Sequence, residues 1–349
     1  MPRKVFTAGE VLAAADVNSF LMNQAVMTFA GSAARSSAIG TATEGMLTYL
    51  ADTDTFQFWN GTAYAPLTPA TPTLEYVVVA GGGGGSLRAA GVAAGGGGAG
   101  GYRTNVVGAL SGGSTVAELP LPIVAGTYGI TVGAGGNKIT IDNEAGTSGS
   151  YSLFINVLCI GGAFGSTFNR GATQGGSGGG GWQGAPTGTS GVLQQGFKGG
   201  NANGGLSGGA GGGGAGATGA TVTGVNGSAG GDGLANSITG TSVTRAGGGG
   251  GGGSTGSGGA GGAGGGGAGS IDGNAAGNGT VNTGGGGGGG EQAGGGSGAG
   301  GSGIVIFSVP TGTGVSFSAG VTQTNATVGS RRVYTVTATS TTSETVTIS

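Results

Sequence analysis

The sequence lacks histidine entirely and is poor in charged residues, proline and cysteine. Its 349 residues include 11 lysines and arginines, 13 acidic residues, 8 prolines and one cysteine. Without histidine, Ser-His-Asp and Cys-His triads are excluded, and so are nearly all zinc sites. The single Cys159 cannot form an internal disulfide, and its place in the apolar run 153–160 predicts a buried thiol rather than a nucleophile.

The net charge of −2 also argues against several kinds of partner. Nucleic-acid binding and polybasic membrane attachment both need clustered lysine and arginine, which the chain does not have. No run of about 20 apolar residues is present, so we expect no membrane insertion. Arg3 and Lys4 stand near the N-terminus, but Glu10 and Asp16 interrupt the apolar core that a signal peptide requires. The sequence therefore predicts neither a nucleic-acid partner nor export by a signal peptide.

Paired carboxylates are the remaining route to catalysis, and the pairs present are weak candidates. They are Asp142 with Glu144, and Asp52 with Asp54. Both lie in short polar turns without an aromatic platform to hold a sugar, and the second pair lacks the further ligands of a calcium loop. Matches to Gly-x-Gly-x-x-Gly are frequent by chance, and none opens an amphipathic helix with an acidic residue about 20 positions on. We expect no enzyme activity, no cofactor and no metal.

Glycine dominates what the sequence does contain. The 97 glycines come in runs such as residues 247–253 and 284–290, without the three-residue period and abundant proline of collagen. Disorder is the alternative, since ordering a glycine costs roughly 0.5–1 kcal/mol more than ordering an alanine. Disordered chains are usually highly charged and poor in apolar residues, however, whereas this chain is 7% charged and 36% hydrophobic. We therefore predict an ordered glycine-rich domain over residues 74–309.

A left-handed helix of the polyproline II type suits these runs. It has three residues per turn and no internal hydrogen bonds, so its N–H and C=O groups are free to bond to neighbouring helices. Side chains at the contacts would hold the helices apart, so the interior must be glycine. A run of nine or ten residues would make a rod about 30 Å long. We expect a sheaf of polyglycine II-like rods, with the islands poor in glycine as loops: residues 164–174, 182–198, 217–246 and 270–283.

The rest of the fold is predicted to be mainly β. Strands at 74–79 and 304–309 are expected to pair and close the glycine segment, with further strands at 128–132, 138–141 and 151–160. Residues 44–73 read as a β-hairpin neck and linker, because Asn60-Gly61 is a strong hairpin turn signal. Residues 310–349 read as a small C-terminal β hairpin or cap, with alternating strands at 332–337 and 344–348.

The N-terminal region, residues 1–43, is predicted to be a short helical head. Thr7 and Glu10 have the spacing of a capping box, and Asp16 precedes a mostly apolar helical face. A helix this short is not stable alone, so the face should contact another subunit, an assembly partner or the next domain. The candidate attachment and oligomerisation residues are Val17, Phe20, Leu21, Gln24 and Met27.

The first two islands contain the candidate binding residues. Aromatic and arginine side chains are the usual energetic anchors of interfaces, and loops on a rigid scaffold commonly form recognition surfaces. The alternative, that the aromatic side chains fill a small core, stays open and applies most to the phenylalanines. The candidates are Phe164, Phe168, Asn169, Arg170, Trp182, Gln194, Gln195, Phe197 and Lys198.

Several short segments near the N-terminus have a family resemblance. They are Phe6-Thr7-Ala8-Gly9-Glu10-Val11-Leu12, Ala15-Asp16-Val17-Asn18, Leu21-Met22-Asn23-Gln24-Ala25-Val26-Met27 and Glu44-Gly45-Met46-Leu47-Thr48-Tyr49 with Trp59-Asn60-Gly61. Together they resemble the opening of minor tail proteins from phages of actinobacteria. The segments 76–81, 101–104, 128–136 and 301–306 resemble the glycine-rich domain of such fibres. The rods also resemble the polyglycine sandwich of some phage tip adhesins, in which loops between the rods form the receptor-binding end.

This resemblance implies a protein of the virion tail that attaches to tail-tip proteins and contacts a host surface glycan or protein through its islands. It also implies a homotrimer, for which the head helix would suit a three-fold bundle. Unlike the adhesins, the chain has its own head and hairpin, so we expect direct attachment to the tail. Three alternatives stay open: a purely structural tail-tip or baseplate component, a tail-associated cell-wall hydrolase, and a non-phage glycine-rich wall or ice-binding protein.

Overall fold

The computed structural model describes residues 26–67, 72–89, 91–168, 170–185, 187–202, 208–292 and 295–349. They fall into two compact units, Met1–Thr71 (unit 1) and Pro72–Ser349 (unit 2). Within the described residues the only α-helix is α2 (Ser32–Ala38), which confirms the prediction of a mainly β protein. No helix in this described part is both long and apolar enough to cross a membrane.

Unit 1 is built on a four-stranded sheet. The strands are β1 (Met27–Phe29), β2 (Leu47–Leu50), β3 (Thr55–Trp59) and β4 (Tyr64–Pro66), and they lie side by side in that order. The predicted hairpins are confirmed, because β2, β3 and β4 form an antiparallel meander. At the turn before β4, the Asn60 side-chain oxygen accepts the N–H groups of Thr62 and Ala63 at 3.0 and 2.9 Å.

The prediction of an attachment helix is wrong at the C-terminal end of that helix. Met27 lies in β1, which pairs in parallel with β2 and places Met27 opposite Thr48. The following Thr28 and Phe29 are residue types that favour strands, and the open edge of β2 gives them hydrogen-bonding partners. The capping-box residues and the other four attachment candidates, Val17, Phe20, Leu21 and Gln24, lie outside the described residues.

Unit 2 begins with two sheets packed face to face. The first has the order β10-β5-β17-β20-β19, with β7 also paired to β5, and the second has the order β13-β12-β11-β21-β18. The strands of the first are β5 (Thr73–Val79), β7 (Tyr102–Thr104), β10 (Leu121–Pro122), β17 (Ile304–Pro310), β19 (Val321–Val328) and β20 (Arg331–Thr339). The strands of the second are β11 (Gly126–Thr131), β12 (Ser152–Phe154), β13 (Val157–Cys159), β18 (Val315–Phe317) and β21 (Thr345–Ile348).

Aromatic side chains fill the space between these sheets. Phe307 of β17 stacks on Phe154 of β12 and on Tyr334 of β20, with ring centres 4.7 and 5.1 Å apart. Cys159 is fully buried in the same core, as predicted, and its thiol lies 3.2 Å from the Val78 carbonyl oxygen. We call this two-sheet structure the sandwich.

The strands at the two ends of the glycine-rich segment pair as the sequence predicted. β5 and β17 are antiparallel neighbours, with Val77 opposite Ile306. The predicted C-terminal strands are β20 and β21, but they do not pair with each other. β20 pairs with β17 and β19, and β21 pairs with β11 and β18, so the C-terminal residues contribute to both sheets.

The predicted strand at residues 138–141 does not form. This segment joins two glycine runs, and its neighbours are extended chains rather than strands. Ile139 exchanges one pair of hydrogen bonds with Ser297, one of them through the serine hydroxyl. The segment therefore forms a loop despite its alternating apolar and polar side chains, because no neighbouring strand provides a continuous set of backbone hydrogen bonds.

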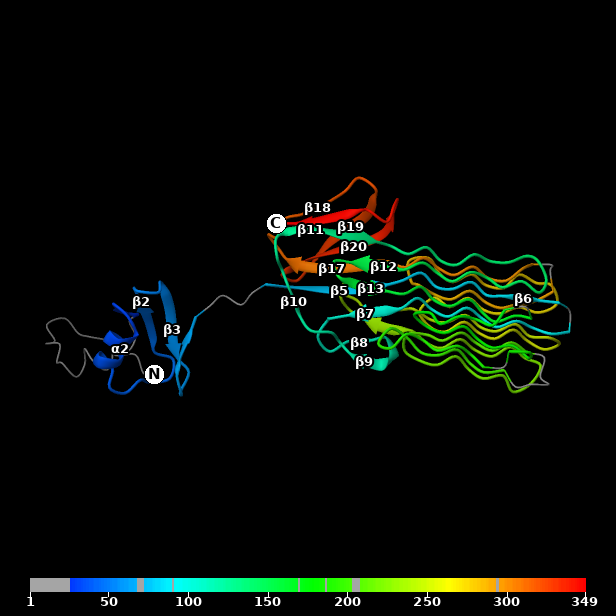
Figure 1. Cartoon of the computed structure of the whole chain (residues 1–349), viewed down its shortest axis with the longest axis horizontal. Helices are drawn as coiled ribbons and strands as arrows, with labels where there is room; N and C mark the ends of the chain where they lie inside the picture. Colours follow the sequence, from blue (N-terminus) through cyan, green and yellow to red (C-terminus); the bar gives the residue numbers. More distant parts are fainter. Residues whose placement is uncertain are drawn as a thin grey trace, which may run out of the picture. The chain divides into compact units, whose positions relative to one another are not determined.

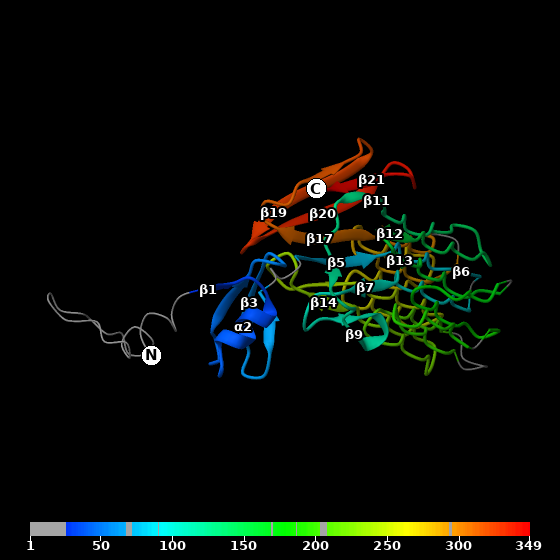
Figure 2. The same cartoon turned by 60° about the vertical axis from the view of Figure 1, so that its left-hand side comes forward.

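From the sandwich, the glycine runs extend as a bundle of parallel and antiparallel rods (Figure 1 and Figure 2). Residues 95–101 show how the rods associate. Their N–H groups donate to three neighbouring runs in turn, and every third N–H group donates to the same run. Their carbonyl groups accept from three other runs. The acceptor runs are residues 160–166, 210–213 and 284–287, and the donors are residues of the runs 80–86 and 177–180 together with Gly249.

This three-residue repeat is the geometry of the polyproline II helix, and it confirms the predicted polyglycine II-like rods. Contacts between rods are too close for side chains. A Cβ atom on Gly97 would lie 2.2 Å from the Gly83 carbonyl oxygen, and one on Gly212 would lie 2.0 Å from that of Gly97. We call this bundle the sheaf.

Candidate binding surface at the loop end of the sheaf

The rods of the sheaf turn back at the end away from the sandwich. Residues 80–86 run outward from β5, and residues 94–101 return to β7 antiparallel to them. The turns gather at the end that carries β6 (Leu87–Arg88), on the right in Figure 1. We call these turns the tip loops; they include residues 87–89, 138–144, 167–168, 182–185 and 271–275.

A cluster of three large side chains lies among the tip loops. The guanidinium carbon of Arg88 is 4.6 Å from the centre of the Phe168 ring and 4.9 Å from that of the Trp182 ring. The two rings meet edge to face with their centres 5.8 Å apart. Arg88 therefore makes cation–π contacts with both rings. We call these three residues the tip cluster.

The cluster presents one aromatic ring to solvent. The Phe168 side chain is 59% exposed, whereas Trp182 is 6% exposed and packs against the Phe168 ring. Near the cluster, the guanidinium of Arg170 lies 4.7 Å from the ring centre of Phe164, which is buried. Phe164 thus fills the packed part of the sheaf, as the alternative for the phenylalanines proposed, while Phe168 does not.

Local hydrogen bonds fix the loops that carry the cluster. β6 pairs in parallel with β16 (Gly290–Glu291), and the Thr167 hydroxyl donates to the Leu87 carbonyl oxygen at 2.9 Å. Trp182 exchanges backbone hydrogen bonds with Ala185 across a tight turn. A Cβ atom on Gly184 would lie 2.2 Å from the Trp182 ring, so only glycine fits at this position in the turn.

Two charged groups are held within the tip. Arg88 donates to the Asn143 side chain, and burial lowers the pKa of its guanidinium while Asp142 acts in the opposite direction. Glu291 is 3% exposed, and its carboxylate accepts the N–H groups of Gly91 and Asp272 at 2.5 and 3.0 Å. Glu291 therefore ties two tip loops together.

The structure separates the remaining candidates from the tip. Residues 188–192 run antiparallel to the rod 175–181, since Thr189 donates to Gly179 and Val192 donates to Gly175. The island 182–198 is thus not one loop, and its second half lies near the sandwich. The Gln195 amide accepts from the Ile160 N–H at 2.7 Å and donates to the Leu158 carbonyl at 3.2 Å. Gln195 is buried and joins the sheaf to the sandwich.

The other members of the predicted set have different surroundings. Gln194 and Lys198 are exposed at the sandwich end, and the backbone of Phe197 bonds within the sheaf. Asn169 lies outside the described residues. The structure therefore brings together Phe168, Trp182 and, nearby, Arg170, and it adds Arg88, which the sequence did not indicate.

The two carboxylate pairs, Asp142 with Glu144 and Asp52 with Asp54, gain no further metal ligands among the described residues. In the described part of the chain, no group of three or more acidic, cysteine or histidine side chains is placed to hold a metal ion. Asp54 has a positive φ of 54° and accepts a hydrogen bond from the Tyr49 hydroxyl, which is consistent with its predicted role in a turn.

The fold and this surface define a glycine-rich structural domain, in which a β sandwich supports a sheaf of backbone-bonded rods. The model of one family, described as a glycine-rich domain, matches residues 60–310. Since this match covers most of the chain, the chain belongs to that glycine-rich domain family. No curated protein matches the sequence.

Proposed function

We propose that this chain is a bacteriophage tail fibre or minor tail protein that recognises a glycan or protein on the host cell surface through its tip loops. Its N-terminal part attaches it to tail-tip proteins, and it acts as a homotrimer within the virion tail. Several copies on one particle would raise avidity without any new contact.

The tip cluster is the observation that supports this proposal. It brings arginine, phenylalanine and tryptophan side chains from three separate loops to one place, with the Phe168 ring 59% exposed. Arginine and aromatic residues are enriched at the cores of protein interfaces, and arginine and tryptophan are among the residues that contribute most of the binding energy. The cluster rests on rods whose backbone groups bond to one another, so the loops project from a rigid scaffold.

A cell-binding assay tests the proposal directly. Fluorescently labelled protein is incubated with a panel of actinobacterial cells, alongside the variants Phe168→Ala and Leu193→Ala. Leu193 is 87% exposed and lies in the turn at the sandwich end of the rods, so it serves as the matched control. We expect saturable binding that Phe168→Ala weakens by about tenfold or more and that Leu193→Ala leaves unchanged.

Two other outcomes would point elsewhere. Absence of saturable binding by the folded protein on every strain would favour a purely structural component of the tail. Release of soluble sugar from the cells by the purified protein would favour a wall hydrolase.

A further inference from the structure

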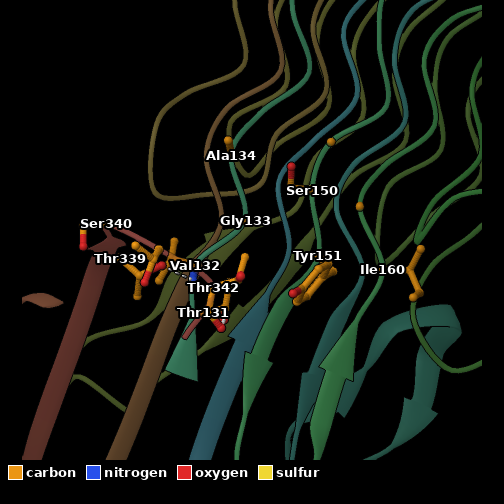
Figure 3. A pocket seen from close by; sticks show the side chains of 13 residues that line it. Thr131, Val132, Gly133, Ala134, Ser150, Tyr151, Ile160, Thr339, Ser340 and Thr342 are labelled. Atoms are coloured by element: carbon orange, nitrogen blue, oxygen red, sulfur yellow. Dashed lines mark hydrogen bonds between the residues drawn. The ribbon is translucent and has the colours of Figure 1, made fainter. Parts of the chain in front are cut away.

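A hollow lies at the opposite end of the rods from the tip loops, where the sandwich meets the sheaf. Its volume is about 510 Å³, and Figure 3 shows the residues around it. One wall is formed by the end of β11 and the loop after β20, including Thr131, Thr339 and Thr342. The other wall is formed by the residues that enter β12, including Ser150 and Tyr151.

Hydroxyl groups surround this hollow, and some of them are already used. The Thr131 hydroxyl donates to the Thr342 carbonyl oxygen at 3.3 Å, and the Thr339 hydroxyl accepts the Val132 N–H at 3.2 Å. These bonds hold the loop after β20 against β11. This wall of the hollow is therefore fixed before any ligand enters.

Other hydroxyl groups have unused bonding capacity. Among the described residues, the side-chain hydroxyls of Ser150, Tyr151 and Thr342 have no hydrogen-bond partner within the protein. Tyr151 is 40% exposed and lines the hollow, so part of its side chain is accessible to a ligand. None of the described residues that line the hollow carries a charge. The Glu344 carboxylate accepts hydrogen bonds from the hydroxyls of Ser318 and of two lining residues, Ser340 and Thr341.

We infer that this hollow binds a neutral saccharide unit. A sugar ring has an apolar C–H face that packs on an aromatic ring and hydroxyl groups that both donate and accept hydrogen bonds. In the hollow, the Tyr151 ring could pack against the C–H face, and the free hydroxyls could bond to the sugar hydroxyls. The volume of the hollow falls in the range typical of ligand sites.

The lining disfavours other kinds of ligand. An anionic sugar or a phosphate would lose hydration without meeting a positive charge, and burying an unpaired charge is costly. A purely apolar ligand would cover the free hydroxyls and leave them without partners. The inference does not depend on the tip loops, and it goes beyond the proposed function by placing a second, separate binding site on the same unit.

Saturation-transfer NMR on the full chain tests this inference. The probes are glucose, galactose, mannose and N-acetylglucosamine, with N-acetylneuraminic acid as the charged comparison. We expect transfer to the ring C–H protons of at least one neutral probe. Tyr151→Ala should weaken its binding roughly five- to tenfold, because the ring surface is lost. Tyr151→Phe should weaken it less, because it keeps the ring and loses only the hydroxyl.

Two controls keep the result interpretable. Thermal unfolding by circular dichroism verifies that the Tyr151 variants are folded. Leu193→Ala, at an exposed residue that does not line the hollow, should leave the NMR signal unchanged. The inference is overturned if no neutral probe shows transfer, if Tyr151→Ala binds as the unmodified protein does, or if N-acetylneuraminic acid binds best. Loss of the signal only in Phe168→Ala would also overturn it, and would place sugar binding at the tip.

Discussion

The α-carbon of Gly83 faces the Ala163 carbonyl oxygen so closely that a Cβ atom on Gly83 would lie 2.0 Å from it. Both residues lie in rods, and the Gly83 N–H donates to Gly98 while its carbonyl accepts from Gly287 at 2.9 Å. A single methyl group here would therefore separate one rod from several neighbours at once. The stability of the sheaf depends on the absence of side chains at such contacts.

We predict that Gly83→Ala lowers the free energy of unfolding by about 3 kcal/mol or more, because the backbone of two rods must move to admit the methyl group. Chemical denaturation followed by circular dichroism measures this loss. Gly224→Ala is the matched control, since a Cβ atom on Gly224 would meet nothing within 4 Å. Equal stability of the two variants would contradict the rod packing.

A second prediction concerns Glu118, whose carboxylate serves two partners. It accepts from the Tyr76 hydroxyl at 2.7 Å and from the Arg103 guanidinium at 2.5 and 2.7 Å. Glu118→Ala removes these bonds and leaves the hydroxyl of Tyr76, a residue only 2% exposed, without its acceptor. We expect a loss of about 1–3 kcal/mol in the free energy of unfolding, at the lower end because the carboxylate is partly exposed.

The comparison for Glu118→Ala is Glu144→Ala, which removes an exposed carboxylate from a tip loop. Glu118→Gln should lie between the two, because the amide oxygen can still accept from Tyr76 while the ion pair with Arg103 is gone. If urea unfolding gave the same midpoint for Glu118→Ala and Glu144→Ala, the Tyr76–Glu118–Arg103 contacts would contribute nothing to stability.

The main features of the sheaf follow from the sequence because they depend on composition. Long glycine runs without proline or charge can be ordered only if their backbones bond to one another, and the three-residue helix allows this. The pairing of β5 with β17 also follows, since two apolar strands at the ends of the segment need partners. The failed strand at 138–141 shows the limit: alternation predicts a strand only where another strand lies alongside.

The candidate site was predicted less well, for a geometric reason. Trp182 and Gln195 are close in sequence, but residues 188–192 run the length of a rod between them and place them at opposite ends. Arg88 was missed because the two residues of β6 are too few to show a period. The glycine runs have nearly identical sequences, so the sequence does not show where the chain reverses direction. Only the hydrogen bonds between the runs show these reversals.

A third prediction concerns the reactivity of Cys159. The residue is fully buried between the sheets, and burial raises the pKa of its thiol above the ordinary value. Because the thiolate is the reactive form, the folded protein should not react with a disulfide reagent at about pH 8. One thiol per chain should react once denaturant is added. Rapid labelling of the folded protein would show that the sandwich opens or that Cys159 is exposed.

The last prediction follows from two buried tyrosines. Burial raises the pKa of both Tyr76 and Tyr102 well above the ordinary value of roughly 10. In the unfolded chain these hydroxyls lose their protons near that ordinary value, while the folded protein retains them. The unfolded state then binds fewer protons, so the free energy of unfolding should fall as the pH rises above about 10. Below that pH the stabilisation is fully present.

Urea unfolding at about pH 8 and about pH 11 measures this fall, and Tyr76→Phe isolates the contribution of one group. The variant loses the hydrogen bond to Glu118 and should be less stable at the lower pH. It also lacks the titrating hydroxyl, so its stability should fall less between the two pH values than that of the unmodified protein. Other groups that titrate in this range act equally on both proteins and cancel in the comparison. Identical falls for the two proteins would mean that the Tyr76 proton is held no more tightly in the folded sandwich than in the unfolded chain.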